Sequence, residues 1–151
     1  MSHLRFYNYP GVGEQNNETY AYSQAVRIGD RIEISGQGGW KSEGPVNAIS
    51  TDLDEEVDQA FANVDLCLRH AGGQGWSQVF RVNSYHVPLG DEAFGAMVRN
   101  FRKWMPDHQP LWTTVGVPKL GLDNMHVEIE VVAHDPEGAK KASEEEGSKK
   151  A

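Results

Sequence analysis

The sequence is short of cysteine, of basic residues and of long apolar runs, and each shortage excludes a class of protein. Its single cysteine, Cys67, excludes an internal disulfide. The 14 Lys and Arg against 22 Asp and Glu leave a net charge of −8, which argues against a surface that follows nucleic-acid phosphates. No apolar run is long enough for a membrane-spanning helix. Residues 1–18 also lack the apolar stretch of a secretory signal, so we expect a cytoplasmic location.

The remaining composition is that of one globular domain with a separate end. With 151 residues, 38% hydrophobic and 24% charged, the chain can bury a single core. Residues 136–151 (PEGAKKASEEEGSKKA) have no large apolar side chain, so we expect a domain over residues 1–135 and a disordered charged tail over residues 136–151. A short solvated helix at residues 139–146 is the alternative.

Two segments show the spacing of amphipathic helices. The first begins near Leu53, where Ser50 or Thr51 can cap it, and ends at the glycine pair 72–73. The second covers residues 91–105 and is followed by Pro106. The apolar positions of the first stripe are Leu53, Val57, Ala60, Phe61, Val64, Leu68 and Ala71, and those of the second are Phe94, Met97, Val98, Phe101, Trp104 and Met105.

Alternation of apolar and polar residues predicts strands in the rest of the domain. They lie at residues 24–28, 31–35, 79–87, 111–117 and 126–134, and the pattern allows a short one at 4–7. A hairpin turn is expected at Gly29-Asp30. The order ββ, α, β, α, ββ predicts an α+β fold, a mixed sheet with two helices on one face.

The period of two also predicts a sheet face without helices. Val127 and Ile129 belong to the face that meets the helices, whereas Glu128 and Glu130 lie on the other. We expect Trp112 and Val132 beside those carboxylates. A face that mixes a tryptophan with acids fits a partner, most simply a second copy of the chain, and the alternative is a solvated antiparallel face.

Five segments in this order resemble the YjgF/RidA family of reactive-intermediate deaminases, a family also labelled L-PSP endoribonuclease. They are residues 21–25 (AYSQA), 34–37 (ISGQ), Asn63 with 71–72 (AG), 113–117 (TTVGV) and 127–130 (VEIE). The resemblance covers residues 20–134. It implies a chorismate-mutase-like fold, a homotrimer with small-molecule clefts between subunits, hydrolysis of 2-imino acids or their enamine tautomers to keto acids and ammonia, and no metal or organic cofactor.

The sequence departs from the family where an arginine clamps the substrate carboxylate. In the segment Pro110-Leu111-Trp112-Thr113, Trp112 stands at the arginine's position, and Lys119 is the nearest cation that the sequence offers. Losing one partner of a buried Arg–carboxylate pair costs about 2–5 kcal/mol. We therefore expect poor activity on 2-iminopropanoate and a neutral or cationic ligand with an apolar or aromatic part, which an indole can stack against.

The resemblance assigns five site residues. Glu128 would position the attacking water, and Thr114 would line the cleft as its second catalytic residue. Tyr22 would cover the ligand, Gly36 would let the backbone approach it, and Trp112 would form a wall. Each has a structural alternative: an interface carboxylate, a strand threonine, a packed tyrosine, a tight turn and an indole that merely fills the cleft.

Other candidates are weaker. Trp40 and Tyr85 would extend the wall, and Cys67 is expected to be a buried hydrophobe. His126, Glu128, Glu130 and His134 share a strand face but lack a diagnostic metal spacing. Beside the deaminase hypothesis stand a non-catalytic trimer that binds a small molecule and, opposed by the acidic charge, an endoribonuclease.

Overall fold

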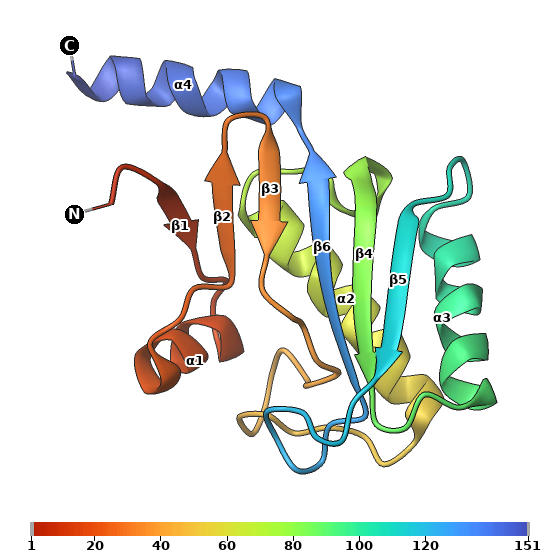
Figure 1. Ribbon diagram of the computed structural model, residues 1–151. Coiled ribbons are helices and arrows are strands. Elements are labelled where there is room, and N and C mark those ends of the chain that lie inside the picture. Colours follow the sequence, from red (N-terminus) through yellow and green to blue (C-terminus); the bar gives the residue numbers. More distant parts are fainter. Residues whose placement is uncertain (1, 151) are drawn as a thin grey trace.

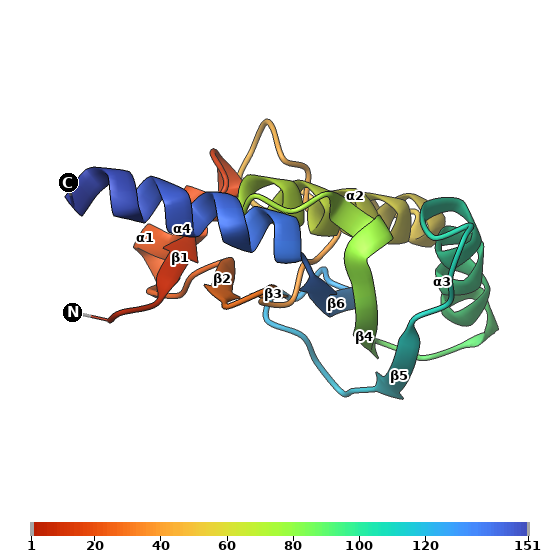
Figure 2. The same ribbon diagram turned by 90° about the horizontal axis from the view of Figure 1, so that it is seen from above.

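A mixed six-stranded sheet carries two helices on one face in the computed structural model, which describes residues 2–150 (Figure 1). In chain order the elements are β1 (Arg5–Tyr7), α1 (Val12–Tyr20), β2 (Ala25–Ile28), β3 (Arg31–Ile34), α2 (Leu53–His70), the 3₁₀ turn η1 (Gly75–Gln78), β4 (Val79–His86), α3 (Asp91–Trp104), β5 (Leu111–Gly116), β6 (Val127–His134) and α4 (Pro136–Lys150). The strand order is β1-β2-β3-β6-β4-β5, in which β4 and β5 are parallel and the other neighbours antiparallel. The predicted α+β class is confirmed, as are α2 and α3 on one face (Figure 2).

Helix α2 closes the core against the sheet as its apolar stripe predicts. The stripe residues Val57, Phe61 and Val64 are fully buried. The cap differs from the prediction of Ser50 or Thr51: it is the next residue, Asp52, whose side chain accepts the Glu55 N–H at 2.9 Å. A carboxylate is an equally good N-cap and also suits the positive helix end. The predicted hairpin turn is confirmed, with Gly29 at φ +58° between β2 and β3.

Trp112 lies on the helix side of the sheet, which corrects the predicted face. In the parallel β4–β5 pair it is opposite Val82, which in turn is opposite the buried Val131 of β6. Its ring lies 4.9 Å from the ring of Phe94 and 5.0 Å from that of Phe101, both on α3. The error came from the register, because a shift of one residue exchanges the two faces of a strand.

The opposite face carries no helix and mixes carboxylates with exposed apolar side chains. Glu128 and Glu130 lie on it, in register with Tyr85 and Asn83. Along the neighbouring edge strand β5, Leu111 is 62% exposed and Val115 41%; Phe6 at the far edge is 49% exposed. The prediction of an acidic, partly apolar bare face is therefore confirmed, with Leu111 and Val115 in the place expected for Trp112.

Two helices were not predicted as such. Helix α1 has no apolar stripe and buries only Val12, Gly13 and Asn16, so periodicity cannot reveal it. Helix α4 occupies residues for which composition predicts disorder, and it is longer than the alternative helix at residues 139–146. Only residues 138, 139 and 142 of its described side chains are half-buried. It leads away from the sheet past β2 (Figure 1).

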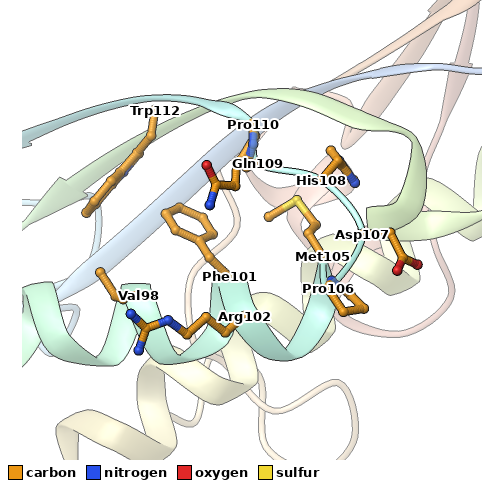
Figure 3. Close-up of a pocket in the computed structure, with 10 residues that line it drawn as sticks. All are labelled: Val98, Phe101, Arg102, Met105, Pro106, Asp107, His108, Gln109, Pro110 and Trp112. Carbon is orange, nitrogen blue, oxygen red and sulfur yellow. The ribbon is translucent and has the colours of Figure 1, made fainter.

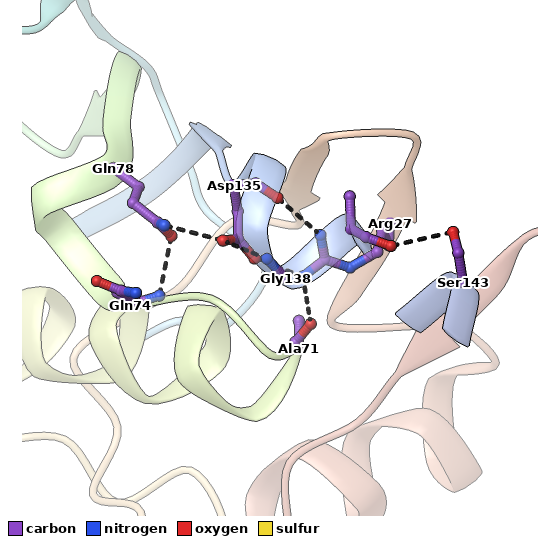
Figure 4. Close-up of polar contacts among 8 residues, drawn as sticks. Arg27, Ala71, Gln74, Gln78, Asp135, Gly138 and Ser143 are labelled. Carbon is purple, nitrogen blue, oxygen red and sulfur yellow. Dashed lines mark hydrogen bonds and ion pairs between the residues drawn. The ribbon is translucent and has the colours of Figure 1, made fainter. Parts of the chain in front are cut away.

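A buried ion pair fixes the start of α4. Arg27 of β2 donates to Asp135 Oδ2 at 2.7 Å, and the two side chains are 7% and 1% exposed. Arg27 also donates to the Ala71 carbonyl, and Gln78 donates to Asp135 Oδ1, so strand, helix ends and turn share one cluster (Figure 4). Asp135 Oδ1 accepts the Gly138 N–H as well, which caps the helix. The first turn of α4 is therefore attached to the buried core through Asp135, even though most of the helix's own side chains are exposed.

Candidate functional site

Glu128 and Tyr22 line one cavity of about 280 Å³ at the end of the sheet. Trp40 also lines this cavity, and its indole donates to the Tyr9 hydroxyl at 3.0 Å. The other lining residues are Asn16, Tyr20, Asn47, Gly121, Leu122 and Met125. The structure thus brings together a carboxylate and aromatic side chains, a combination that suits a neutral or cationic ligand.

The Glu128 carboxylate is half-buried and has no hydrogen-bond or ion-pair partner among the side chains that the structure describes, those of residues 2–149. Burial raises the pKa of Glu128, and the neighbouring charge of Glu130 raises it further. Glu130 in contrast accepts hydrogen bonds from Tyr85 at 2.6 Å and Asn83 at 3.2 Å. Glu128 is therefore the carboxylate left free to bind a ligand or water, and Glu130 belongs to the surrounding structure.

The backbone at Gly36 lies close against the Glu128 side chain. A Cβ built on Gly36 would overlap the Glu128 side chain. Any residue other than glycine here would displace the carboxylate. Gly36 therefore lies against Glu128, a contact that the turn alternative for Gly36 does not explain.

Trp112 lines a different cavity, of about 820 Å³, between α3 and the loop that leads into β5 (Figure 3). Its neighbours there include Val98, Phe101, Met105 and Arg102. The expectation that Lys119 is the nearest cation to Trp112 is wrong, because Arg102 lines the same cavity as Trp112 and Lys119 does not. Arg102 is exposed, and in Figure 3 its side chain runs along α3 toward Val98 without pointing at the indole.

Thr114 lies on the same face of β5 as Trp112 and is half-buried. Its hydroxyl is 2.9 Å from Ser84 Oγ, and the Trp112 indole N–H donates to that same oxygen at 2.9 Å. Trp112 is thereby held by a hydrogen bond as well as by the α3 rings. Ser84 was not singled out in the sequence, because only the strand register reveals a buried hydroxyl between these side chains.

The five predicted site residues therefore form two groups on one chain. Tyr22 and Glu128 line the smaller cavity, and Gly36 lies against the Glu128 side chain. Trp112 lines the larger cavity, and Thr114 is joined to it through the Ser84 hydroxyl. The two cavities share no lining residue. Trp40 was expected to extend the cleft wall beside Trp112, but it lines the smaller cavity with Glu128 and Tyr22.

The sequence did not reveal the role of Glu56, a buried carboxylate near the start of β6. Glu56 of α2 is fully buried and accepts hydrogen bonds from the backbone N–H of His126 at 2.6 Å, from its Nδ1 at 2.8 Å and from the Val127 N–H at 3.3 Å. It therefore fixes the start of β6, two residues before Glu128. In the sequence Glu56 is one of three acids in a first helical turn, where a role with the helix dipole is the ordinary interpretation.

The remaining candidates have structural roles in the described residues. Cys67 is buried, and burial raises the pKa of its thiol to about 12, as expected for an unreactive side chain. Between residues 2 and 150 no three His, Cys, Asp or Glu side chains converge as metal ligands would. Within the same span, no helix has the length and apolar character to cross a bilayer.

The sequence resembles known proteins over most of its length. It is 32% identical over 119 residues to the RutC family protein YjgH of Escherichia coli, covering 78% of this chain and 86% of that one. It is likewise 32% identical over 111 residues to a protein of Dermatophagoides farinae named 2-iminobutanoate/2-iminopropanoate deaminase, covering 74% and 83%.

The fold leads to the same group of proteins. The solved structure of protein YJGH superposes with a TM-score of 0.75 at 28% identity, covering 90% of this chain and 99% of that one. Residues 14–135 match the family described as Endoribonuclease L-PSP. The chain is therefore a member of the Endoribonuclease L-PSP family, the family of the YjgF/RidA and RutC proteins.

Proposed function

We propose that the protein hydrolyses a reactive imine to a carbonyl compound and ammonia, with Glu128 positioning the water. Water adds to the imine carbon, and the C–N bond of the resulting carbinolamine then breaks. The observation that carries this proposal is the unpartnered, half-buried Glu128 carboxylate in a cavity with Tyr22 and Trp40. A carboxyl group whose pKa is raised can accept a proton from water and return it, which is typically worth about 10²–10⁴ in rate.

We infer that each site is completed by a second protomer of a homotrimer. Glu128 lines one cavity of the chain and Trp112, which Ser84 links to Thr114, lines another, so two chains are needed to bring the two groups to one ligand. The bare sheet face supports association, because Leu111 and Val115 are exposed on it. The family resemblance supports the same arrangement.

The substrate we propose is an imine without a carboxylate and with an apolar or aromatic part. An indole stands where family members have a guanidinium, and the neighbouring Arg102 is solvated and directed along α3. A solvated ion pair contributes only about 0–1 kcal/mol, too little to replace a buried clamp. Glu128 and Glu130 would repel an anion. The substrate in the Dermatophagoides protein's name, 2-iminopropanoate, is such an anion.

The test compares two imines formed in situ. One is the neutral imine that an amine oxidase forms from 2-phenylethylamine, and the other is 2-iminopropanoate, formed from alanine by an amino-acid oxidase. We expect the protein to accelerate aldehyde release from the first well beyond the oxidase alone, and Glu128→Gln to abolish that acceleration. Arg99→Ala, on the exposed side of α3, is the control and should keep it.

Two results would overturn parts of this proposal. Fast turnover of 2-iminopropanoate that is lost in Arg102→Ala would show that Arg102 replaces the clamp, and the substrate class would be wrong. Binding of the aromatic amine without acceleration of either imine would support the non-catalytic trimer. The endoribonuclease alternative requires salt-sensitive RNA cleavage by the purified protein, which the charge of −8 opposes.

A further inference from the structure

The hydroxyl of Ser84 makes three contacts of 2.9 Å, which is all that one hydroxyl can satisfy. They join its Oγ to the indole Nε1 of Trp112, to Nε2 of His86 and to Oγ1 of Thr114. A serine hydroxyl has one hydrogen and two lone pairs. The indole N–H can only donate, so one lone pair is used by Trp112, and the direction of the other two bonds depends on His86.

His86 is fully buried, and its second ring nitrogen, Nδ1, has no partner among the described residues. Were the proton on Nδ1, a buried N–H would lack an acceptor, a rare and costly arrangement. With the proton on Nε2, only a lone pair is left unpaired, and the ring donates to Ser84. An imidazolium would carry both the orphaned N–H and a buried charge, and burial lowers the pKa of His86.

The bond directions follow from this tautomer. Ser84 Oγ accepts from Trp112 and from His86, so its only hydrogen goes to Thr114 Oγ1. Because Thr114 accepts that hydrogen, its own hydroxyl hydrogen is free. Thr114 is half-buried on the edge strand β5 and has no other side-chain partner in residues 2–150.

We propose that Ser84 and His86 are positioning residues that make the Thr114 hydroxyl a hydrogen-bond donor to the ligand, so that the site selects an acceptor atom at this point. Resting on the proposed function, that acceptor is the imine nitrogen or the amine nitrogen of the carbinolamine. With the reverse arrangement Thr114 would donate inward to Ser84 and offer the ligand only lone pairs. The tautomer of the buried His86 thus determines whether the Thr114 hydroxyl donates a hydrogen bond to the ligand or only accepts one.

The first test needs no substrate. Nitrogen-15 NMR of the histidine-labelled protein distinguishes the two neutral tautomers and the imidazolium, and His86→Gln identifies the His86 signals among those of the six histidines. We expect a neutral ring protonated at Nε2 from pH 7.5 to pH 8.5. A proton at Nδ1, or an imidazolium within this range, would overturn the proposal whether or not any imine is turned over.

The second test uses turnover of the 2-phenylethylamine-derived imine. Thr114→Val removes the donor and should lower kcat by about 100-fold. His86→Phe should give a smaller loss, because Thr114 can then turn its hydrogen inward, and the double variant should be no worse than Thr114→Val alone. His86→Gln keeps an N–H donor and should restore much of the activity lost in His86→Phe. Losses that multiply in the double variant would show that His86 acts independently of Thr114 and would contradict the proposal.

Discussion

The indole N–H of Trp112 donates to Ser84 Oγ at 2.9 Å, so the side chain at the family's arginine position is anchored inside its own protomer. Its ring also packs on Phe94 and Phe101 of α3. We predict that Trp112→Phe, which keeps an aromatic ring, lowers the free energy of unfolding by about 1 kcal/mol through the lost hydrogen bond. Trp112→Ala should lose about 3 kcal/mol because the α3 rings lose their neighbour. Urea unfolding measures both, and equal small losses would show that the indole is not anchored.

Replacing Arg27 should destabilise the domain far more than replacing a solvated arginine. Arg27→Met leaves Asp135 buried and unpaired, and we expect a loss of about 3–5 kcal/mol in the free energy of unfolding. The matched control is Arg99→Ala, which breaks two exposed pairs with Asp54 and Asp58 and should cost about 0–1 kcal/mol. Similar losses for the two variants would mean that the Arg27 cluster does not hold the start of α4.

A methyl group added at Gly36 should lower imine turnover, whereas one added at Gly95 should not. In Gly36→Ala the new Cβ overlaps Glu128, so we expect the carboxylate to move and imine turnover to fall by at least about 10². Gly95→Ala is the control: it is in α3, its Cβ would meet open space, and it should stabilise the helix by about 1 kcal/mol with unchanged turnover. Full activity of Gly36→Ala would show that the close approach is irrelevant to catalysis.

Glu128 and Asp135 should make the stability of the fold depend on pH in opposite directions. The pKa of Glu128 is raised in the folded chain, first by burial and then by Glu130, so stability falls as pH rises from the unfolded pKa of about 4.3 through the folded one. Glu128→Gln removes that loss and should be more stable than the parent at pH 7, with the difference vanishing in acid.

Asp135 supplies the opposite case. Burial opposes ionisation, but hydrogen bonds from Arg27 and Gln78 lower the pKa of Asp135 overall. Its contribution to stability is therefore present above the unfolded pKa of about 3.9 and is lost as pH falls through the folded one. Asp135→Asn should be less stable at pH 7, and its deficit should shrink in acid. Urea midpoints across pH 2–8 test both signs, and a deficit that grows in acid would contradict this account.

The spacing of apolar residues predicted the helices that bury an apolar stripe. The errors arose where contacts distant in the sequence determine the structure. The α2 and α3 stripes revealed both helices within a residue or two of their observed ends. The side of the sheet on which Trp112 lies depends on its register with Val82, which no local pattern shows. Helix α4 depends on a contact between Arg27 and Asp135 across 108 residues, so its composition alone misled.

The sequence offers a set of candidate site residues but not their arrangement, and their roles stay predictions. Motif resemblance pointed to Glu128, Tyr22 and Gly36, which the fold does bring together. It did not reveal that Trp112 lies at another cavity, nor that Ser84 connects Trp112 with Thr114, because both facts require the strand pairings.

The proposed sharing of a site between two protomers is tested most directly by mixing two impaired variants. Glu128→Gln and Thr114→Val are co-expressed with different tags, mixed trimers are purified, and aldehyde release from the 2-phenylethylamine-derived imine is measured. In each purified mixed trimer, with two copies of one variant and one of the other, about a third of the sites would take an intact Glu128 from one variant and an intact Thr114 from the other. The account predicts recovery of about that fraction of parental activity. Mixed trimers no more active than the better single variant would contradict it.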